Sequence, residues 1–237
     1  MKLFMPKQHG AWAMLIVPFG LGIAHSGFDW MHIPLAIAWL SLYLATYPFL
    51  LALKKKKDAK EHMMWVYRYA GVAAIAVLPV LVTHWKVVYA GFLMLPFFLL
   101  NIYFSKVNKD RAFLNDMSAI LAFSMSVFAV AIVGGGTLDN EAFMLWTYSV
   151  LFFTGSTFFV KTMIREKKNP AFRWMSWFYH IITFVLVAVL QGMISLAFLP
   201  SLIRAIVLYG RKLKPIQIGI LEIINSVWFF CFILFFH

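Results

Sequence analysis

Long apolar stretches separated by short polar connections constrain this chain more than any other feature. A hydrocarbon core about 30 Å thick requires roughly 20 mostly apolar residues per helix. Nine such segments are expected, at residues 11–28, 33–53, 66–83, 86–104, 114–133, 141–162, 172–190, 192–209 and 216–236. Because the connections are short, sequential helices should be antiparallel neighbours. The sequence therefore predicts an all-α, polytopic membrane protein, with residues 1–237 forming a single domain of about nine transmembrane helices in one bundle.

The composition agrees with this class. Apolar and aromatic residues make up 63% of the 237 positions and charged residues 13%, which is too apolar for a water-soluble core. The single cysteine, Cys231, lies in the apolar run WFFCFILFF, so one chain has no disulfide framework and no Cys-based metal site. The basic start resembles a signal peptide, but LIVPFGLGIAHSGF continues too far without a small-residue exit. We therefore expect a retained first span.

Positive charge falls on one side of the expected helices. Of the 21 Lys and Arg residues, all except Lys86 fall on the same side of the expected helices. Lys and Arg accumulate on the cytoplasmic side of membranes, so the N-terminus is expected inside, the C-terminus outside, and the chain in the cell membrane. The net charge is +12, and the charged residues lie between apolar segments. This pattern indicates membrane lipids as partners and not nucleic acid. Lys54 to Lys57, Arg211, Lys212 and Lys214 are interpreted as anchors on anionic lipid.

Polar side chains also occur within the spans, mainly near the expected cytoplasmic ends. Such residues are costly in lipid and usually face a cavity or a partner. Lys161 and Arg165 are four residues apart and share a helix face, where two cations repel unless an anion or carboxylate lies between them. The candidate ligand-binding residues are Lys7, Gln8, His9, Lys106, Arg111, Asn115, Asp116, Lys161, Thr162, Arg165, Arg173, His180, Arg204, Glu222 and Asn225.

Two interpretations of these residues stay open. The first is an internal network with three parts: Asp116 with Arg111 or Arg173, Glu222 with Arg204, and His180 as a hydrogen-bonded core histidine. The second is a cytoplasm-facing pocket, cationic at its mouth and apolar above, for an amphiphile with a phosphate or diphosphate head. In that pocket the candidate catalytic groups are His9, His180 and Asp116.

Three stretches of the chain resemble the YwiC-like family of bacterial integral membrane proteins. They are PKQHGAWAM at 6–14, NDMSAILAF at 115–123 and FVKTMIREKKNPAFRW at 159–174. The resemblance covers the whole chain and implies a multi-pass membrane protein. Because that family carries no established biochemical activity, the resemblance implies no particular reaction.

A more distant similarity is to the UbiA superfamily of intramembrane prenyltransferases. YFSKVNKDRAFLNDMSAILAF at 103–123 is similar to that family's connection between its fourth and fifth helices. The similarity implies nine helices, a cytoplasmic N-terminus and a pocket open to the cytoplasm. UbiA enzymes hold Mg²⁺ on two Asp-rich segments, whereas the corresponding positions here read TYPFLLALKKKKD and FVKTMIREKKNP. The case for a Mg²⁺ cofactor is therefore weaker than for those enzymes.

The resulting hypothesis is a membrane protein that binds a prenyl or lipid phosphate from the cytoplasmic leaflet. It could catalyse group transfer without a Mg²⁺ cluster, with Lys161 and Arg165 as direct phosphate ligands. One alternative is a transporter or permease, in which intramembrane ionisable residues line a path. Another is a non-catalytic or haem-binding subunit of a respiratory complex, with His9 and His180 as axial ligands.

Overall fold

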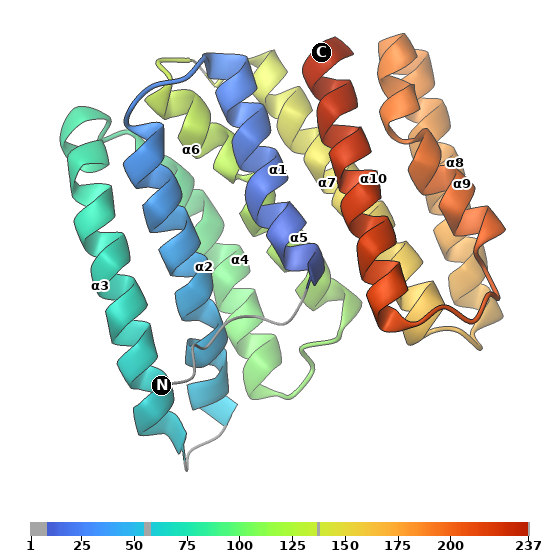
Figure 1. Cartoon of the computed structure of the whole chain (residues 1–237), viewed down its shortest axis with the longest axis horizontal. Helices are drawn as coiled ribbons and strands as arrows, with labels where there is room; N and C mark the ends of the chain where they lie inside the picture. The colour runs from blue at the N-terminus through green and yellow to red at the C-terminus, as the bar shows by residue number, and fades with distance from the viewer. Residues whose placement is uncertain (1–8, 55–57, 137, 237) are drawn as a thin grey trace. The chain divides into compact units, whose positions relative to one another are not determined.

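The structure, a computed structural model, describes residues 9–54, 58–136 and 138–236, and of His9 only the backbone. Within these ranges the regular structure is helical throughout (Figure 1), so the all-α prediction is confirmed. The helices are α1 His9–Ser26, α2 His32–Lys54, α3 Ala59–Thr83, α4 Val87–Lys106, α5 Phe113–Ser124, α6 Ser126–Val133, α7 Asn140–Ile164, α8 Pro170–Gln191, the 3₁₀ helix η2 Gly192–Ala197, α9 Leu199–Val207 and α10 Pro215–Phe236.

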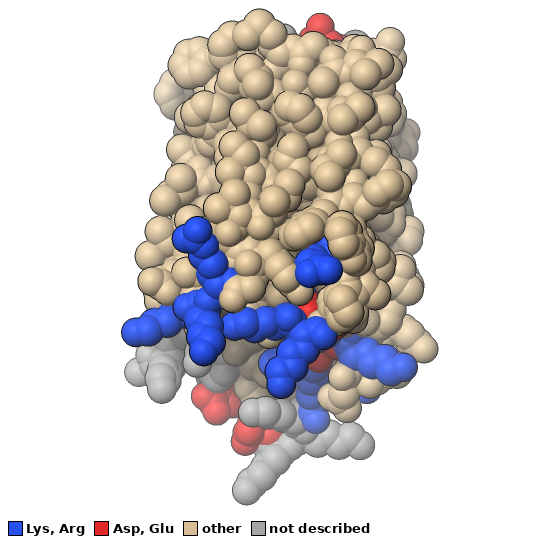
Figure 2. Space-filling model, turned by 90° about the vertical axis from the view of Figure 1, so that its right-hand side faces the viewer, with Lys and Arg blue, Asp and Glu red and all other residues tan. Residues whose placement is uncertain are grey.

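Seven of the expected segments are long and apolar enough to cross a membrane. They are α2, α3, α4, α5 with α6, α7, α8 with η2, and α10. The first expected segment is a shorter apolar helix, and α1 ends next to Gly27, whose φ of 80° is a left-handed conformation that glycine adopts readily. In Figure 2, Lys and Arg gather at one end of the face and uncharged residues cover most of the remainder. The chain is a polytopic helical membrane protein.

The expectation of one continuous helix at 192–209 is wrong. Gly192, with a φ of 57°, follows the end of α8, and the chain then forms η2 before α9 begins next to Pro200. Proline lacks a backbone N–H and disfavours a helical conformation in the residue before it, so it is most favourable in the first turn of a helix. Pro200 accordingly lies in the first turn of α9. η2 still packs against both α8 and α10.

The chain forms two compact units. Unit 1 contains Pro18–Trp146, and unit 2 contains His9–Val17 and Thr147–His237. The single bundle expected for residues 1–237 stays a prediction, as do the inside and outside ends of the helices.

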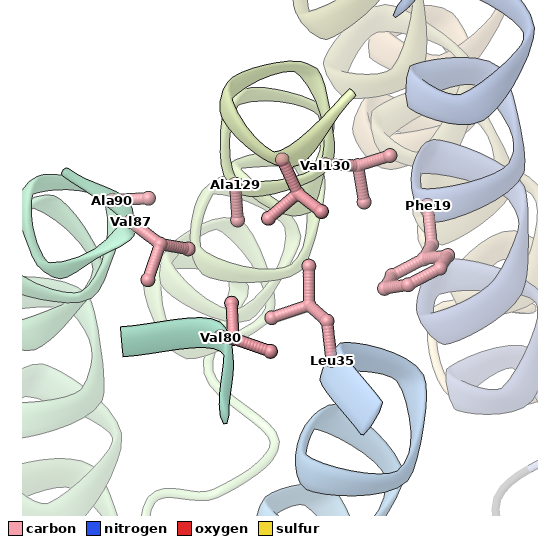
Figure 3. Packing of buried hydrophobic residues seen from close by; sticks show 8 residues of the cluster. Phe19, Leu35, Val80, Val87, Ala90, Ala129 and Val130 are labelled. Atoms are coloured by element: carbon pink, nitrogen blue, oxygen red, sulfur yellow. The ribbon is translucent and has the colours of Figure 1, made fainter. Parts of the chain in front are cut away.

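Unit 1 has an apolar core supplied by α1, α2, α3, α4 and α6. Its buried residues are Phe19, Leu35, Val80, Val87, Ala90, Ala129, Val130 and Val133 (Figure 3). Valine and alanine predominate, and the small alanine side chains let the helices approach closely at Ala90 and Ala129. The imidazole of His32, 1% exposed, ties α2 to α6 because its Nε2 lies 3.0 Å from the carbonyl oxygen of Val130.

Unit 2 packs α7 against α8, α9 and α10. The rings of Phe152 and Phe229 stack with their centres 4.1 Å apart, and Phe159 lies in a second apolar cluster with Ala205 and Ile218. On α8 the buried positions are Ser176, His180, Thr183 and Val187, whereas Trp174, Phe178, Val185 and Val189 are exposed. Since lipid tails are as apolar as these side chains, α8 can present its apolar face to lipid and turn its polar face into the unit.

Candidate anion-binding end and buried polar network

Four predicted site residues lie in unit 1 around the connection between α4 and α5. Lys106 and Arg111 are exposed, and Asn115 and Asp116 are partly buried. Asn115 Nδ2 donates to the carbonyl oxygen of Asp110 at 2.7 Å, and the carbonyl oxygen of Asn115 accepts a hydrogen bond from Ser118 Oγ at 2.9 Å. These bonds hold the connection, so Asn115 has a structural role. The expected partner of Asp116 stays a prediction.

Lys54, interpreted from the sequence only as a lipid anchor, forms an ion pair with Asp110. The pair links the end of α2 to the connection that follows α4. Its side chains are 24% and 39% exposed, and exposed pairs of this kind contribute about 0–1 kcal/mol. Asp110 is the one acidic residue in KVNKDR, which is the signal that could have suggested this contact.

The cations at the end of α7 do not share one environment. Lys161 is 6% exposed, whereas Arg165 is exposed and lies just beyond the helix. Thr162 Oγ1 donates to the carbonyl oxygens of Phe158 and Phe159 at 2.9 and 2.7 Å. That bonding pattern is the usual one for a threonine inside an apolar helix, so Thr162 needs no ligand to satisfy its hydroxyl.

Arg204 and Glu222 form an ion pair between α9 and α10. Both side chains are buried, at 7% and 8% exposure. Arg204 Nη2 also donates to Ser156 Oγ on α7 at 3.1 Å, and its Cζ lies 4.5 Å from the centre of the Phe159 ring. The internal pair expected for these two residues is thus present, and it occupies the guanidinium that the pocket interpretation had assigned to a phosphate.

A second polar contact lies one turn further along α10. Asn225 Nδ2 donates to Ser201 Oγ on α9 at 2.9 Å, and both residues are buried. Ser226 Oγ donates to the backbone oxygen of Glu222 at 2.8 Å. Asn225 therefore joins α10 to α9 beside the Arg204–Glu222 pair.

His180 occupies the same interior from α8. Its Nδ1 lies 2.7 Å from the carbonyl oxygen of Ser176, and the side chain is buried at 4% exposure. Its Nε2 points at Gly155 on α7, where an added Cβ would lie only 3.1 Å away. The glycine is what allows the imidazole to approach. His180 is thus a core histidine hydrogen-bonded on one side.

The space beside His180 is small. A cavity lined by Gly155, Tyr179, His180, Ser201 and four other residues offers about 10 Å³ to the centre of a water molecule, whereas a cofactor-sized ligand needs about 300–1,000 Å³. His180 as placed therefore has no room for a haem or a phosphate at Nε2. Lys7, Gln8 and the side chain of His9, the other predicted haem ligand, lie outside the described residues.

Arg173 is held differently, by aromatic rings in the first turn of α8. Its Cζ lies 4.8 Å from the ring centre of Trp174, 5.3 Å from that of Trp177 and 5.2 Å from that of Tyr209. Trp177 Nε1 in turn donates to the carbonyl oxygen of Ala205 at 2.9 Å. In the part of the chain that the structure describes, Arg173 forms no ion pair and its Nε has no hydrogen-bond partner.

Further cations surround Arg173 at this end of unit 2, where α7 connects to α8 and α9 to α10. They are Arg165, Lys167, Lys168, Arg211, Lys212 and Lys214. The one acid within 165–173 is Glu166, whose carboxylate accepts from Asn169 Nδ2 at 2.9 Å. Figure 2 shows Lys and Arg at one end of its face. The N-terminus of α8 adds a partial positive charge there, so this end can attract an anion.

The described residues contain no evident set of metal ligands. Among the described residues, no group of three or more His, Cys, Asp and Glu side chains could hold a metal ion. The chemistry that the described side chains can offer is anion binding by Arg173 and its neighbouring cations, and proton transfer by His180.

Long apolar helices with short connections and an inward-facing polar network define a polytopic α-helical integral membrane protein. Within that class the chain belongs to the YwiC-like family, because the family model described as YwiC-like protein matches residues 5–131. The expectation from the sequence motifs is confirmed. The UbiA similarity stays a prediction.

Two relatives are similar over nearly the whole chain. The protein named "Uncharacterized protein YwiC" of Bacillus subtilis is 45% identical over 231 residues, which are 97% of this chain and 96% of that protein. A protein of Haemophilus influenzae, named "Uncharacterized protein", is 39% identical over 235 residues, 99% of this chain and 98% of that protein. No solved structure matches the chain.

Proposed function

We propose that this protein resides in the cell membrane and binds an anionic amphiphile, a prenyl or lipid phosphate, at the cationic end of unit 2. This end would face the cytoplasm because Lys and Arg accumulate on that side. The phosphate head would bind Arg173, and the chain of the amphiphile would follow the lipid-facing side of α8.

The observation that carries the proposal is the arrangement around Arg173. Cation–π contacts with Trp174, Trp177 and Tyr209 restrict the guanidinium and leave its charge without a described carboxylate partner. A guanidinium recognises a phosphate through two parallel hydrogen bonds. Because the aromatic rings already order the side chain, binding a phosphate loses little further conformational freedom.

Apolar surface for the rest of the ligand lies next to Arg173. Trp174 and Phe178 are exposed at 59% and 67%, one and five residues beyond Arg173 along α8. An amphiphile with its head at the cationic end can therefore lie against apolar side chains along its length. The proposal replaces the pocket expected from the sequence with this site, because Arg204 is paired with Glu222.

The test is ligand binding measured by native mass spectrometry in detergent, with farnesyl phosphate and phosphatidic acid as separate probes and farnesol as the uncharged control. The Arg173→Gln variant should bind either phosphate about ten- to a hundredfold more weakly, as expected for a lost charged hydrogen bond of about 1.5–3 kcal/mol. Arg173→Lys should be intermediate, because ammonium binds phosphate as a point charge without the bidentate geometry.

A matched control is Arg68→Gln in unit 1. Arg68 also lies over a tryptophan, with its Cζ 5.1 Å from the ring centre of Trp65, so the two variants lose the same charge and a similar contact. Phosphate binding should be unchanged in Arg68→Gln. The proposal fails if folded Arg173→Gln binds farnesyl phosphate and phosphatidic acid as tightly as the wild type, or if farnesol binds equally well. A preference between the two phosphates would identify the source of the head group.

Transport is the second candidate function. It is favoured by the buried pair of Arg204 and Glu222, since ionisable residues inside membrane proteins often mark a path for ions or solutes. Solute flux into proteoliposomes that is present in the wild type and absent in Glu222→Gln protein shown to be folded would support transport. The same Arg173→Gln variant should leave that flux unchanged if the two functions are separate.

A further inference from the structure

The geometry of His180 determines which of its nitrogens carries the hydrogen. Nδ1 lies 2.7 Å from the carbonyl oxygen of Ser176, and a carbonyl oxygen can only accept a hydrogen bond. Nδ1 is therefore the donor, and in a neutral imidazole Nε2 is then an acceptor. This Nε2 is buried and has no hydrogen-bond partner among the described protein atoms. It needs a donor, because a buried polar atom without a partner costs about 1–3 kcal/mol.

Ser201 supplies the complementary group on α9. Its Oγ accepts a hydrogen bond from Asn225 Nδ2 at 2.9 Å, whereas its own hydroxyl hydrogen is donated to no described atom. Ser201 and His180 line the same cavity, which offers about 10 Å³ to the centre of a water molecule. One acceptor and one donor thus face a space of about one water molecule, since a buried water requires about 10–15 Å³ and two to four polar partners.

We propose that this cavity is a binding site for a single water molecule that donates to His180 Nε2 and accepts from Ser201 Oγ. The bound water completes a hydrogen-bonded chain from His180 on α8 through Ser201 on α9 to Asn225 on α10. The inference is independent of the amphiphile site, because Arg173 lies two turns away along α8 and takes no part in it.

The water gives His180 a property that a histidine enclosed only by protein atoms lacks. Its Nε2 gains a hydrogen-bond donor, which no described side chain supplies. Ser156, the residue after Gly155, receives a hydrogen bond from Arg204, so the hydrated histidine lies beside the Arg204–Glu222 pair. Unit 2 therefore contains a hydrated histidine within its interior, linked by hydrogen bonds to α9 and α10.

The test uses nuclear magnetic resonance on full-length protein carrying ¹⁵N-histidine in lipid nanodiscs, with the His180 signals assigned by their loss in His180→Gln. The wild type should show hydrogen on Nδ1 and a cross-peak between Nε2 and water. Gly155→Ala should abolish that cross-peak, because the new Cβ would lie 3.1 Å from Nε2 and fill the space. Gly71→Ala is the matched control, since its Cβ would meet nothing within 4 Å.

Ser201→Ala provides a second variant that keeps the space and removes one partner of the water. It should retain the His180 tautomer and weaken the water cross-peak by severalfold, which keeps the inference testable if Gly155→Ala does not fold. A wild-type protein whose Nε2 carries the hydrogen, or whose Nε2 gives no water cross-peak, would overturn the inference. So would an undiminished cross-peak in folded Gly155→Ala or in folded Ser201→Ala.

Discussion

His32 Nε2 donates to the carbonyl oxygen of Val130 across 3.0 Å, joining the first turn of α2 to the middle of α6. The ring is oriented by a second bond, in which the backbone N–H of Asp29 donates to Nδ1 at 2.9 Å. Because an N–H can only donate, Nδ1 is the acceptor and Nε2 carries the hydrogen. Both ring nitrogens are thus satisfied inside the protein, and His32 acts as a structural cross-link in unit 1.

Replacing His32 with alanine should lower the stability of the protein. Loss of the ring removes the partner of the Asp29 amide and one of the two donors to the Val130 carbonyl oxygen, which also accepts from the Gly134 N–H at 3.0 Å. Each lost hydrogen bond contributes about 0.5–1.5 kcal/mol, and removing the buried ring also leaves a cavity. Thermal unfolding in detergent should show a clearly lower midpoint for His32→Ala. His84→Ala is the control, because the hydrogen bond of the His84 ring among the described residues is to the neighbouring Thr83 hydroxyl, in an exposed position. Equal midpoints for the two variants would contradict the structural role.

Gly22 on α1 should not tolerate alanine. An added Cβ would lie 2.8 Å from Val130 Cβ and 3.0 Å from the backbone oxygen of Val127. Alanine favours a helix over glycine by about 1 kcal/mol, but overpacking a core against backbone atoms costs about 1–3 kcal/mol. The clash should prevail, so Gly22→Ala should unfold at a lower temperature than the wild type.

Gly71 and Gly91 are the matched controls for this experiment. Both lie inside helices, and a Cβ at either position would meet nothing within 4 Å. Alanine should raise or preserve the midpoint there, because only the helix preference changes. If Gly22→Ala were as stable as Gly71→Ala, the close packing of α1 on α6 would be wrong.

The membrane class and most helices were predictable from the sequence because both follow from the length and hydropathy of local segments. The interruption after Gln191 was not, since GMISLAF is as apolar as a spanning helix. α8 ends next to Gly192, whose φ of 57° is left-handed, and Pro200 lies in the first turn of α9, which begins at Leu199. A proline in the middle of an expected span was the available signal, although Pro18, Pro48, Pro79 and Pro96 lie inside helices.

The candidate site was predictable only as a set of residue types near helix ends. Their pairing depends on which helix faces meet, and a single sequence does not contain that information. The Arg204–Glu222 pair was one of the two interpretations that the sequence left open. The contact of Arg204 with Ser156 was not expected, because a serine in an apolar helix has no distinguishing pattern. One of the aromatic contacts of Arg173 could be predicted from the sequence, because Trp177 lies four residues after it on the same helix face. The contact with Tyr209 could not, because only the folded chain brings Tyr209 next to Arg173.

The Arg204–Glu222 pair should behave as a coupled unit. Removing one partner leaves the other charge buried and alone, which costs about 3–5 kcal/mol, whereas replacing both with apolar residues of similar size is often neutral. Arg204→Met and Glu222→Leu should each destabilise the protein strongly. The double variant should be more stable than either single variant, as measured by unfolding midpoints in detergent. Additive losses in the double variant would show that the charges do not interact.

The predicted topology can be tested where the sequence and the structure differ most, at residues 192–207. The six residues of η2 and nine of α9 extend about 25 Å at the rises of 3₁₀ and α-helices, close to the thickness of a hydrocarbon core. The basic cluster of Arg211, Lys212 and Lys214 should keep the following connection in the cytoplasm. Because the 22 residues of α8 alone extend about 33 Å, that span does not need η2, and η2 and α9 together should return the chain across the membrane.

Alkaline phosphatase, which is active only outside the cytoplasm, provides the measurement. Fusions truncated after Gln191 and after Phe236 should be active, and a fusion after Lys212 should be inactive. A fluorescent protein that folds only in the cytoplasm should give the opposite pattern and serves as the control for expression. If the reporters after Gln191 and Lys212 behaved alike, residues 192–207 would not cross the membrane, and the C-terminus would lie on the same side as the cationic end of unit 2.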